Sequence, residues 1–270
     1  MRNAVLAAAL LSVLAGSARA DDPYLSPTQD RVRVSLGISQ ANATTSFQLD
    51  ASDGTPGSVI DGENTLGLDP KRIVPEFEVE VRAGERHRLR INYSALDRDD
   101  TRPLTAPLLQ YGGTTLLLGD PVETNLSIRA FALTYGYSFV RNDRLELAAT
   151  LGVSDVDISS RVMVATATRR VDIIHSFAGP FPIPGLEATW VLSKRFYLDA
   201  HVQYLKASIN KLSASTNQYE LHALYRLRPN ISFALGFSSL TSDLTSRKPG
   251  SMGFADFSAR GPQLFIRVAF

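Results

Sequence analysis

The 270-residue chain contains no cysteine, so disulfide bonds and thiolate metal sites are excluded. After the first twenty residues, it also lacks any apolar run of the roughly twenty residues that a membrane-spanning helix needs. An excess of one charge is missing too, because 28 basic and 27 acidic residues leave a formal net charge of +1. This balance argues against the basic surface that nucleic-acid binding requires. We therefore expect no nucleic-acid partner.

The N-terminus has the three parts of a secretory signal peptide. Arg2 supplies a positive charge, the segment AVLAAALLSVLAG is apolar, and Ala18 and Ala20 have the spacing of a cleavage site. A membrane anchor or a buried helix is the alternative, but the apolar run is short for a span. We expect cleavage after Ala20. The chain then divides into a signal peptide at 1–20, a short periplasmic N-terminal segment at 21–29 and a barrel domain at 30–270.

Apolar residues recur at every second position through most of the remaining sequence. A period of two is typical of β-strands, whose side chains alternate between the two faces. Ten segments show it: RVRVSLGIS, VPEFEVEVR, RLRINYSA, TNLSIRAFALTYGYSFV, RLELAATLGV, GLEATWVLS, FYLDAHVQYL, YELHALYRL, ISFALGFSS and PQLFIRVAF. In the fourth segment the apolar parity changes near Ala130–Phe131, which predicts a β-bulge.

The connections between these segments alternate in chain order between two kinds. The tight ones lie around Ala83–His87, Arg141–Asp143, Lys194–Arg195 and Arg228–Asn230. The others are Ala41–Arg72, Asp97–Val122, Ser159–Pro184 and Thr245–Gly253, with a shorter one near Asn210–Ala214. Sorted connections are typical of an up-and-down barrel, with turns at one rim and loops at the other. We expect about ten strands, with eight or twelve as alternatives.

The solvent that meets the apolar face decides between a soluble and a membrane protein. In a soluble barrel or sandwich the apolar face points inward, whereas in a membrane barrel it meets lipid and the lumen is polar. Here the opposite face carries charged and small residues, and the aromatic residues Phe139, Phe196 and Phe270 lie near the tight-turn rim, as in an aromatic girdle. The sequence therefore predicts an all-β, transmembrane, up-and-down antiparallel β-barrel. A secreted β-sandwich is the alternative.

The C-terminal segment PQLFIRVAF has apolar residues at alternate positions, namely Leu264, Ile266, Val268 and the terminal Phe270. It resembles the terminal strand signature of bacterial outer-membrane β-barrel proteins. The resemblance implies a location in the outer membrane of a Gram-negative bacterium, surrounded by outer-membrane lipid. It also implies that these four residues form a C-terminal assembly signal for the barrel-assembly machinery. We expect a monomer, because a closed barrel satisfies its own strand edges.

Charged residues cluster on the predicted lumen face of three consecutive strands. The residues are Arg31, Arg33, Glu76, Glu78, Glu80, Arg88 and Arg90. Cross-strand neighbours on one face come within pairing distance, so the carboxylates would be flanked by guanidinium groups on both sides. In a narrow barrel this arrangement predicts an interior charge network that restricts or closes the pore.

Catalytic and metal sites have weaker support in the sequence. His175 and Ser176 are adjacent and therefore point to opposite faces, while Asp199 and His201 share a face but lack a nearby nucleophile. His201 and His222 on neighbouring strands are the best metal candidates, yet we expect no metal and no cofactor. We expect a non-enzymatic barrel, acting as a narrow porin or as a structural or surface-interaction barrel with a charged lumen. The alternative is an outer-membrane barrel hydrolase of lipid or peptide that uses loop or rim residues.

Overall fold

The computed structural model describes residues 26–270, except 52, 54, 106–107, 112–113, 166–169, 210–211 and 247–251. The side chains of residues 49, 108, 111, 114, 174–179, 209, 212 and 252 also lie outside the description. The expected signal peptide and its cleavage site after Ala20 lie outside the described residues, so both remain predictions. Within the described residues, no helix is long and apolar enough to cross a membrane.

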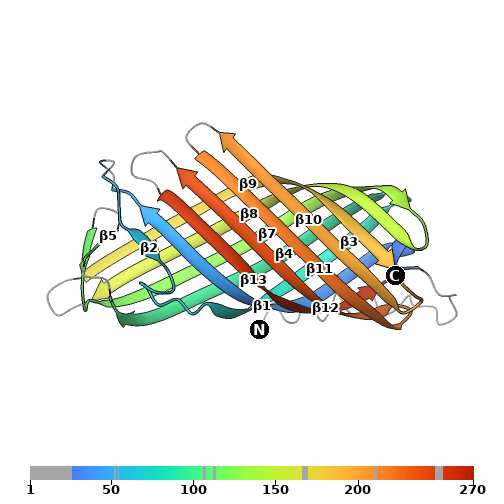
Figure 1. Ribbon diagram of the computed structural model, residues 1–270, viewed down its shortest axis with the longest axis horizontal. Helices are drawn as coiled ribbons and strands as arrows, with labels where there is room; N and C mark the ends of the chain where they lie inside the picture. The colour runs from blue at the N-terminus through green and yellow to red at the C-terminus, as the bar shows by residue number, and fades with distance from the viewer. Residues whose placement is uncertain are drawn as a thin grey trace, which may run out of the picture.

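Within the described residues, ten long strands form the barrel wall (Figure 1). They are β1 (Val32–Leu49), β3 (Lys71–Ala83), β4 (His87–Pro103), β7 (Pro121–Arg141), β8 (Leu145–Ala165), β9 (Arg170–Val191), β10 (Phe196–Ile209), β11 (Leu212–Arg228), β12 (Ile231–Ser246) and β13 (Met252–Ala269). Each pairs antiparallel with the next, and β13 pairs with β1 from Arg33–Ala269 outward, which closes the barrel. The predicted up-and-down barrel of about ten strands is confirmed.

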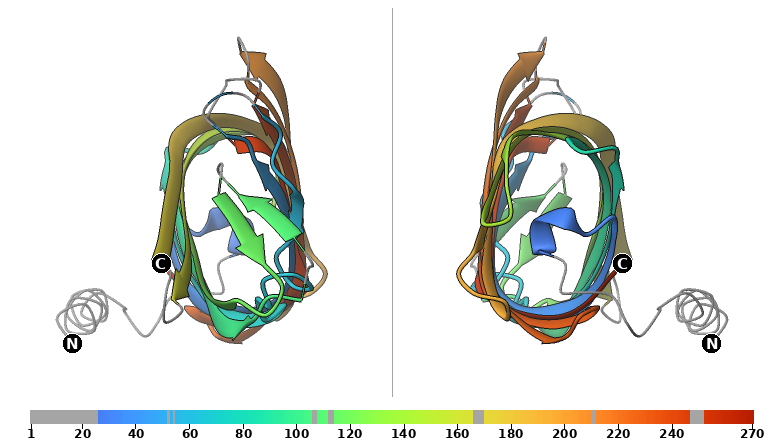
Figure 2. Two further views of the ribbon diagram at one scale, coloured as in Figure 1. Left: turned by 90° about the vertical axis from the view of Figure 1, so that its left-hand side faces the viewer. Right: turned by 90° about the vertical axis from the view of Figure 1, so that its right-hand side faces the viewer.

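Shorter elements lie at the two ends of the barrel. The tight turns at 84–86, 142–144, 192–195 and 229–230 mark what we call the periplasmic end, because short turns face the periplasm in such barrels. The 3₁₀-helix η2 (Pro27–Gln29) lies across this end (Figure 2). At the opposite, outer end, β2 (Val59–Asp61) pairs with β1, and β5 (Leu108–Tyr111) and β6 (Thr114–Leu117) form a hairpin across the opening (Figure 2).

The outer face of the wall carries a band of exposed apolar side chains. Leu235 is 64% exposed, and exposed Leu, Val, Ile, Phe, Tyr and Trp residues continue around the wall strands. The band includes Leu36, Phe77, Leu89, Leu133, Leu151, Leu186, Val202, Leu221, Phe233 and Ile266. These residues occupy the face that the sequence assigned to lipid. The polar residues Ser232 and Gln263 are buried in the interior, so the predicted face assignment is confirmed.

The β-bulge predicted near Ala130–Phe131 is wrong. The register of β7 with β8 is unbroken from Val122 to Ser138, and the shift lies between Ser138 and Val140. Leu126 and Ile128 keep the inward direction of their parity and pack inside the barrel. The apolar residues change face because the surroundings change: beyond the membrane the outer face of the wall meets water, so the inner face carries the apolar core.

The strands extend much further outward than the sequence indicated. The segment Ser159–Pro184, expected as a loop, is mostly strand, since β8 and β9 stay paired out to Ala165–Arg170. Strand β9 has 22 residues, about twice the 9–11 that cross a bilayer. The outer extension is filled by a hydrophobic core of Phe47, Ile60, Leu66, Leu104, Leu109, Leu116, Val122, Val162 and Val164. This part of the protein is therefore built like a soluble β-barrel.

Candidate functional site: the charged lumen

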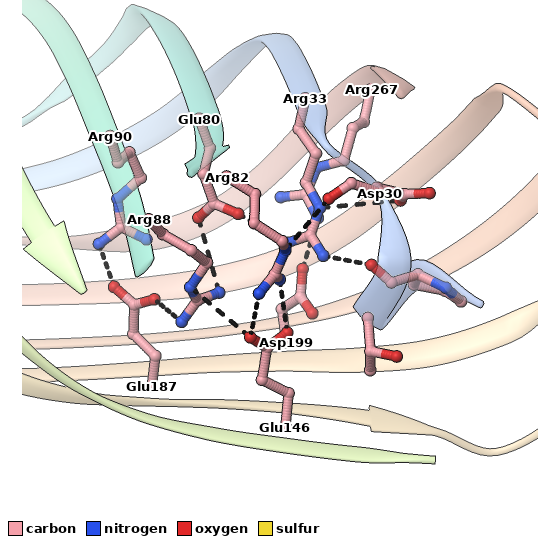
Figure 3. A network of polar contacts seen from close by, with 12 residues as sticks. Asp30, Arg33, Glu80, Arg82, Arg88, Arg90, Glu146, Glu187, Asp199 and Arg267 are labelled. Carbon is pink, nitrogen blue, oxygen red and sulfur yellow. Dashed lines mark hydrogen bonds and ion pairs between the residues drawn. The ribbon is translucent and has the colours of Figure 1, made fainter. Parts of the chain in front are cut away.

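The periplasmic half of the lumen contains a continuous network of ion pairs (Figure 3). Six guanidinium groups take part, from Arg33, Arg82, Arg88, Arg90, Arg226 and Arg267. Six carboxylates pair with them, from Asp30, Glu78, Glu80, Glu146, Glu187 and Asp199. The two charges balance, which burial in a low-dielectric interior requires.

A bidentate pair between Arg82 and Glu146 crosses the lumen from β3 to β8. Arg82 donates from Nη1 and Nη2 to the two carboxylate oxygens at 2.8 Å each. The side chains are 2% and 0% exposed, and Ser138 Oγ donates a further hydrogen bond to Glu146. Planar bidentate pairs of this kind are among the stronger hydrogen-bonded contacts in proteins.

Arg88 and Arg90 on β4 extend the network sideways. Arg88 Nη2 lies 2.9 Å from Glu187 Oε2, and its Nη1 lies 3.6 Å from Glu80 Oε2. Its Nε lies 3.8 Å from Glu146 Oε1. Arg90 contacts the other oxygen of Glu187. Glu187, on β9, therefore accepts from two neighbouring guanidinium groups at once. These contacts join β3, β4, β8 and β9 through the interior.

Arg267 on β13 connects this cluster to the opposite wall. Its guanidinium contacts Asp199 on β10, lies 3.6 Å from Glu78 on β3, and donates from Nε to Ser35 Oγ at 3.0 Å. Asp199 is 2% exposed. Together with Arg33, which lies 3.2 Å from Glu80, these contacts link β1, β3, β10 and β13.

The N-terminal segment closes the periplasmic mouth. Asp30 accepts a hydrogen bond from Arg226 at 2.8 Å and lies 3.7 Å from Arg33. Arg33 and Arg141 donate to backbone carbonyls of η2, the latter at 3.0 Å to Thr28. Ser26 Oγ donates to the Asp143 carbonyl at 2.7 Å, so the segment is also tied to a turn of the rim. The part of the predicted N-terminal segment that the structure describes thus lies within the barrel end.

Five of the seven residues predicted for the lumen network belong to it: Arg33, Glu78, Glu80, Arg88 and Arg90. Arg31 does not, since its side chain is exposed at the rim and forms no ion pair within the described part of the chain. Glu76 lies further outward and accepts hydrogen bonds from Gln263 Nε2 at 3.0 and 3.3 Å. Arg31 lies just before β1, which begins at Val32, so the strand parity used for the prediction does not hold at this position.

Sequence reasoning missed seven members of the network. They are Asp30, Arg82, Glu146, Glu187, Asp199, Arg226 and Arg267. The residues on the wall strands lie opposite the apolar face of their own segments, so strand parity alone could have placed them in the lumen. Arg82 continues the charged run of β3, and Asp30 precedes β1. The other five lie on strands β8 to β13, away from β1, β3 and β4, whose runs of charge carry the prediction.

The predicted histidine pairs also point into the lumen. His201 Nδ1 lies 3.4 Å from Glu220, and His222 Nε2 lies 2.8 Å from Gln263 Oε1. The two imidazoles are neighbours, with ring centroids 6.2 Å apart. Among the described residues no group of three potential metal ligands comes together. The side chains of His175 and Ser176, the other candidate pair, lie outside the description.

Above the network lies a cavity of about 390 Å³. Its floor is polar and includes Glu76, His201, Glu220 and Gln263. Its walls are largely apolar, with Val74, Leu96, Ile128 and Ile158 among the lining residues. The hydrophobic core of the outer extension lies between this cavity and the outer end. The lumen is therefore occupied at both ends and hollow between them.

The C-terminal strand presents the predicted assembly signal to the outside. Leu264 and Ile266 are about half exposed on the outer face. Phe270 follows the end of β13, where its backbone N–H donates to the Val32 carbonyl at 2.9 Å and its carbonyl accepts from Arg31 at 2.7 Å. Backbone hydrogen bonds thus join the first and last strands up to the final residue.

Substituting Phe270 with Ala is expected to lower the amount of protein assembled in the outer membrane without preventing export. The apolar surface that the assembly machinery is expected to bind would lose its terminal aromatic ring. Heat-modifiable, membrane-embedded protein is the measurement. Leu118→Ala, which removes an exposed leucine near the outer end, is the control. Wild-type assembly of the Phe270 variant would contradict the assignment of the signal.

Comparison with known proteins supports the fold. No protein-family model and no curated protein sequence matches the chain. The crystal structure of the outer-membrane protease OmpT from Escherichia coli is similar, with a TM-score of 0.57 and 12% identity over 92% of this chain and 99% of OmpT. The translocator domain of the autotransporter NalP from Neisseria meningitidis has a TM-score of 0.50 and 12% identity, over 100% of this chain and 96% of that one.

The fold is that of a bacterial outer-membrane β-barrel. Such barrels are closed because an unpaired strand edge in lipid leaves backbone groups without partners. The ring of ten strands and its apolar outer band meet both requirements, and they place the chain in the outer membrane. At these identities the two neighbours establish the architecture only.

Proposed function

We propose that this protein is a non-enzymatic outer-membrane barrel whose lumen is closed, and that it acts as a structural or surface-interaction protein rather than as a porin. The network of twelve paired charges across the periplasmic half carries the proposal. A ten-stranded barrel is little wider than the eight-stranded barrels that side chains just fill, so long Arg and Glu side chains occupy most of its section.

The energetics of buried charges support permanent closure. Opening a pore through the network would separate guanidinium and carboxylate groups that are nearly inaccessible to water, and unpaired buried charges are costly. The N-terminal segment adds a second layer, because Asp30 pairs with both Arg33 and Arg226, and Arg33 also donates a hydrogen bond to η2. A gate would have to break both layers together.

The outer extension supports a role at the cell surface. The wall strands continue beyond the membrane around a hydrophobic core, which holds the outer loops on a rigid frame. Its outward side chains are polar, such as Asp155 and Asp157 on β8, both exposed. This arrangement presents a water-facing surface well above the lipid.

The hydrolase alternative has less support. A hydrolase of the triad type needs a nucleophile, a base and an orienting group within hydrogen-bond reach. The lumenal histidines His201 and His222 instead contact Glu220 and Gln263, which act as structural partners.

Liposome swelling tests the proposal. Purified protein reconstituted in phosphatidylcholine vesicles should leave their rate of swelling in isosmotic arabinose at the level of protein-free vesicles. The same vesicles should release no product from a fluorogenic peptide or from their own phospholipid. Swelling that depends on protein concentration would contradict closure, and hydrolysis in the absence of swelling would favour the enzyme.

A further inference from the structure

A seam interrupts the barrel wall between β9 and β10. Their antiparallel register runs from Val191–Tyr197 to Gly185–Gln203 and stops there. Both strands continue outward beyond this point while staying paired with their other neighbours, β8 and β11. Among the described residues, no pairing joins β9 and β10 further out. Figure 2 shows the hairpin of β10 and β11 projecting away from the ring of strands.

Three prolines explain why the pairing stops. Pro180, Pro182 and Pro184 occupy alternate positions of β9 just beyond the last paired residue. The N–H of Val191 donates toward β8, to Arg144, whereas the N–H of Leu192 donates toward β10, to Phe196. Because the N–H direction alternates along a strand, the N–H groups at even-numbered positions of β9 point toward β10. Proline has no N–H, so three successive donors toward β10 are missing while the ladder to β8 is intact.

The seam begins inside the lipid-facing band. On β8, Leu151 and Val153 lie opposite Pro184 and Pro182, and both are exposed on the outer face. The outer face of β8 becomes polar at Asp155, opposite Pro180. The first part of the seam therefore meets the outer leaflet of the membrane. Unpaired N–H groups would be costly there, and the prolines remove three such groups from the β9 side of the seam.

The seam borders the central cavity. Phe181 and Ile183 of β9 and Gln203 of β10 line both the seam and the cavity of about 390 Å³. This volume lies within the range of small-molecule sites, about 300–1,000 Å³. The hydrophobic core around Phe47 and Leu116 covers the cavity on its outer side, and the charge network covers it on its periplasmic side. The interrupted wall at the seam is therefore the route into the cavity that we consider.

We propose that the cavity binds a single-chain lipophile that enters sideways from the outer leaflet through the β9–β10 seam. The alkyl chain would lie against the apolar wall, and the head group would reach the polar floor. Among the described residues Glu76 on that floor forms no ion pair and is hydrogen-bonded by Gln263. A carboxylate head would be repelled by Glu76, so the ligand carries a neutral or cationic head that donates hydrogen bonds.

Labelling of an introduced cysteine tests the route, because the chain has no cysteine of its own. Ile158→Cys places a thiol in the cavity, and Thr55→Cys places one on an exposed outer loop. In phosphatidylcholine nanodiscs, N-decylmaleimide should label the Ile158 variant faster than a sulfonated, water-soluble maleimide does, and the order should reverse for the Thr55 variant. Preferential labelling of the cavity thiol by the sulfonated reagent would overturn lateral entry.

Restoring the missing donors should close the seam. In the Ile158→Cys background, the triple variant Pro180→Val, Pro182→Val and Pro184→Val should reduce the rate of N-decylmaleimide labelling by about tenfold, because β9 and β10 can then pair. Pro75→Val, which replaces an exposed proline of β3, is the matched control and should keep the original rate. An unchanged rate in a folded triple variant, or a loss in the Pro75 variant instead, would overturn the seam. The reagent comparison in the unaltered wall does not depend on folding of the triple variant.

Competition tests the head group. Decylamine and 1-decanol should protect the cavity thiol from N-decylmaleimide, and decanoate should protect it much less. Glu76→Gln should narrow the difference between decanoate and 1-decanol. Equal protection by all three in the protein with Glu76 would overturn the assignment of the head group.

Discussion

Substituting Glu146 with Ala is expected to lower the free energy of unfolding by about 3–5 kcal/mol, which is the usual consequence of removing one partner of a buried ion pair. Glu146 is fully buried and accepts both Arg82 bonds, with Arg88 nearby at 3.8 Å. The variant leaves the Arg82 guanidinium in the lumen with backbone carbonyls as its remaining partners. Urea titration of the barrel in lipid vesicles measures the loss.

Two controls test whether the loss of stability in the Glu146 variant comes from leaving a buried charge unpaired. The double variant Arg82→Leu and Glu146→Leu removes both partners and should be closer to wild type than Glu146→Ala. Asp172→Ala breaks the exposed pair with Arg161, which has a similar bidentate geometry at 2.8 and 2.6 Å, and should have little effect because that pair is solvated. Equal destabilisation by the single and double variants would show that the network is not held together by charge pairing.

Substituting Leu235 with Arg should lower the free energy of unfolding by about 2–4 kcal/mol, because it places a charge among lipid chains. Leu235 is 64% exposed on the outer face of β12. Folding yield into lipid vesicles, followed by heat modifiability and urea titration, is the measurement.

The matched control lies on the same strand and points inward. Ser238 lines the cavity, so Ser238→Arg should be tolerated better than Leu235→Arg. Ser232, which also points inward on this strand, is unsuitable as a control because it is 2% exposed and accepts a hydrogen bond from Tyr197. Equal losses of folding yield and of unfolding free energy in the Leu235 and Ser238 variants would contradict the assignment of the lipid-facing and lumen-facing sides of the strand.

The barrel could be predicted from the sequence because lipid imposes a simple rule on each membrane-spanning strand. Side chains at alternate positions meet hydrocarbon, as Leu264 and Ile266 do, and this leaves a period of two. The rule fails above the membrane. There Leu126 and Ile128 point inward, and without knowledge of the membrane boundary this reversal looks like a bulge.

The charge network could be predicted only in part for a different reason. Strands that are neighbours in the sheet, such as β1 and β3, give pairs that sequence order already suggests. For example, Arg33 lies opposite Glu80 in the register and 3.2 Å from it. The contact of Arg82 with Glu146 crosses the lumen between strands that are not neighbours, so it depends on the diameter of the closed barrel. The sequence predicts a loop at Ser159–Pro184 and therefore gives no indication of the seam, whereas Pro180, Pro182 and Pro184 lie in strand β9.

Single-channel recording in planar bilayers tests the closed lumen most directly. Wild-type protein is expected to show no conductance or a small one, since the paired charges and the N-terminal segment occupy the periplasmic half of the lumen. Combined substitution of Glu80, Glu146 and Glu187 with Ala should raise the conductance, because it removes the carboxylates that hold Arg33, Arg82, Arg88 and Arg90 in place. A large, steady conductance of the wild-type protein would contradict closure and would favour a porin.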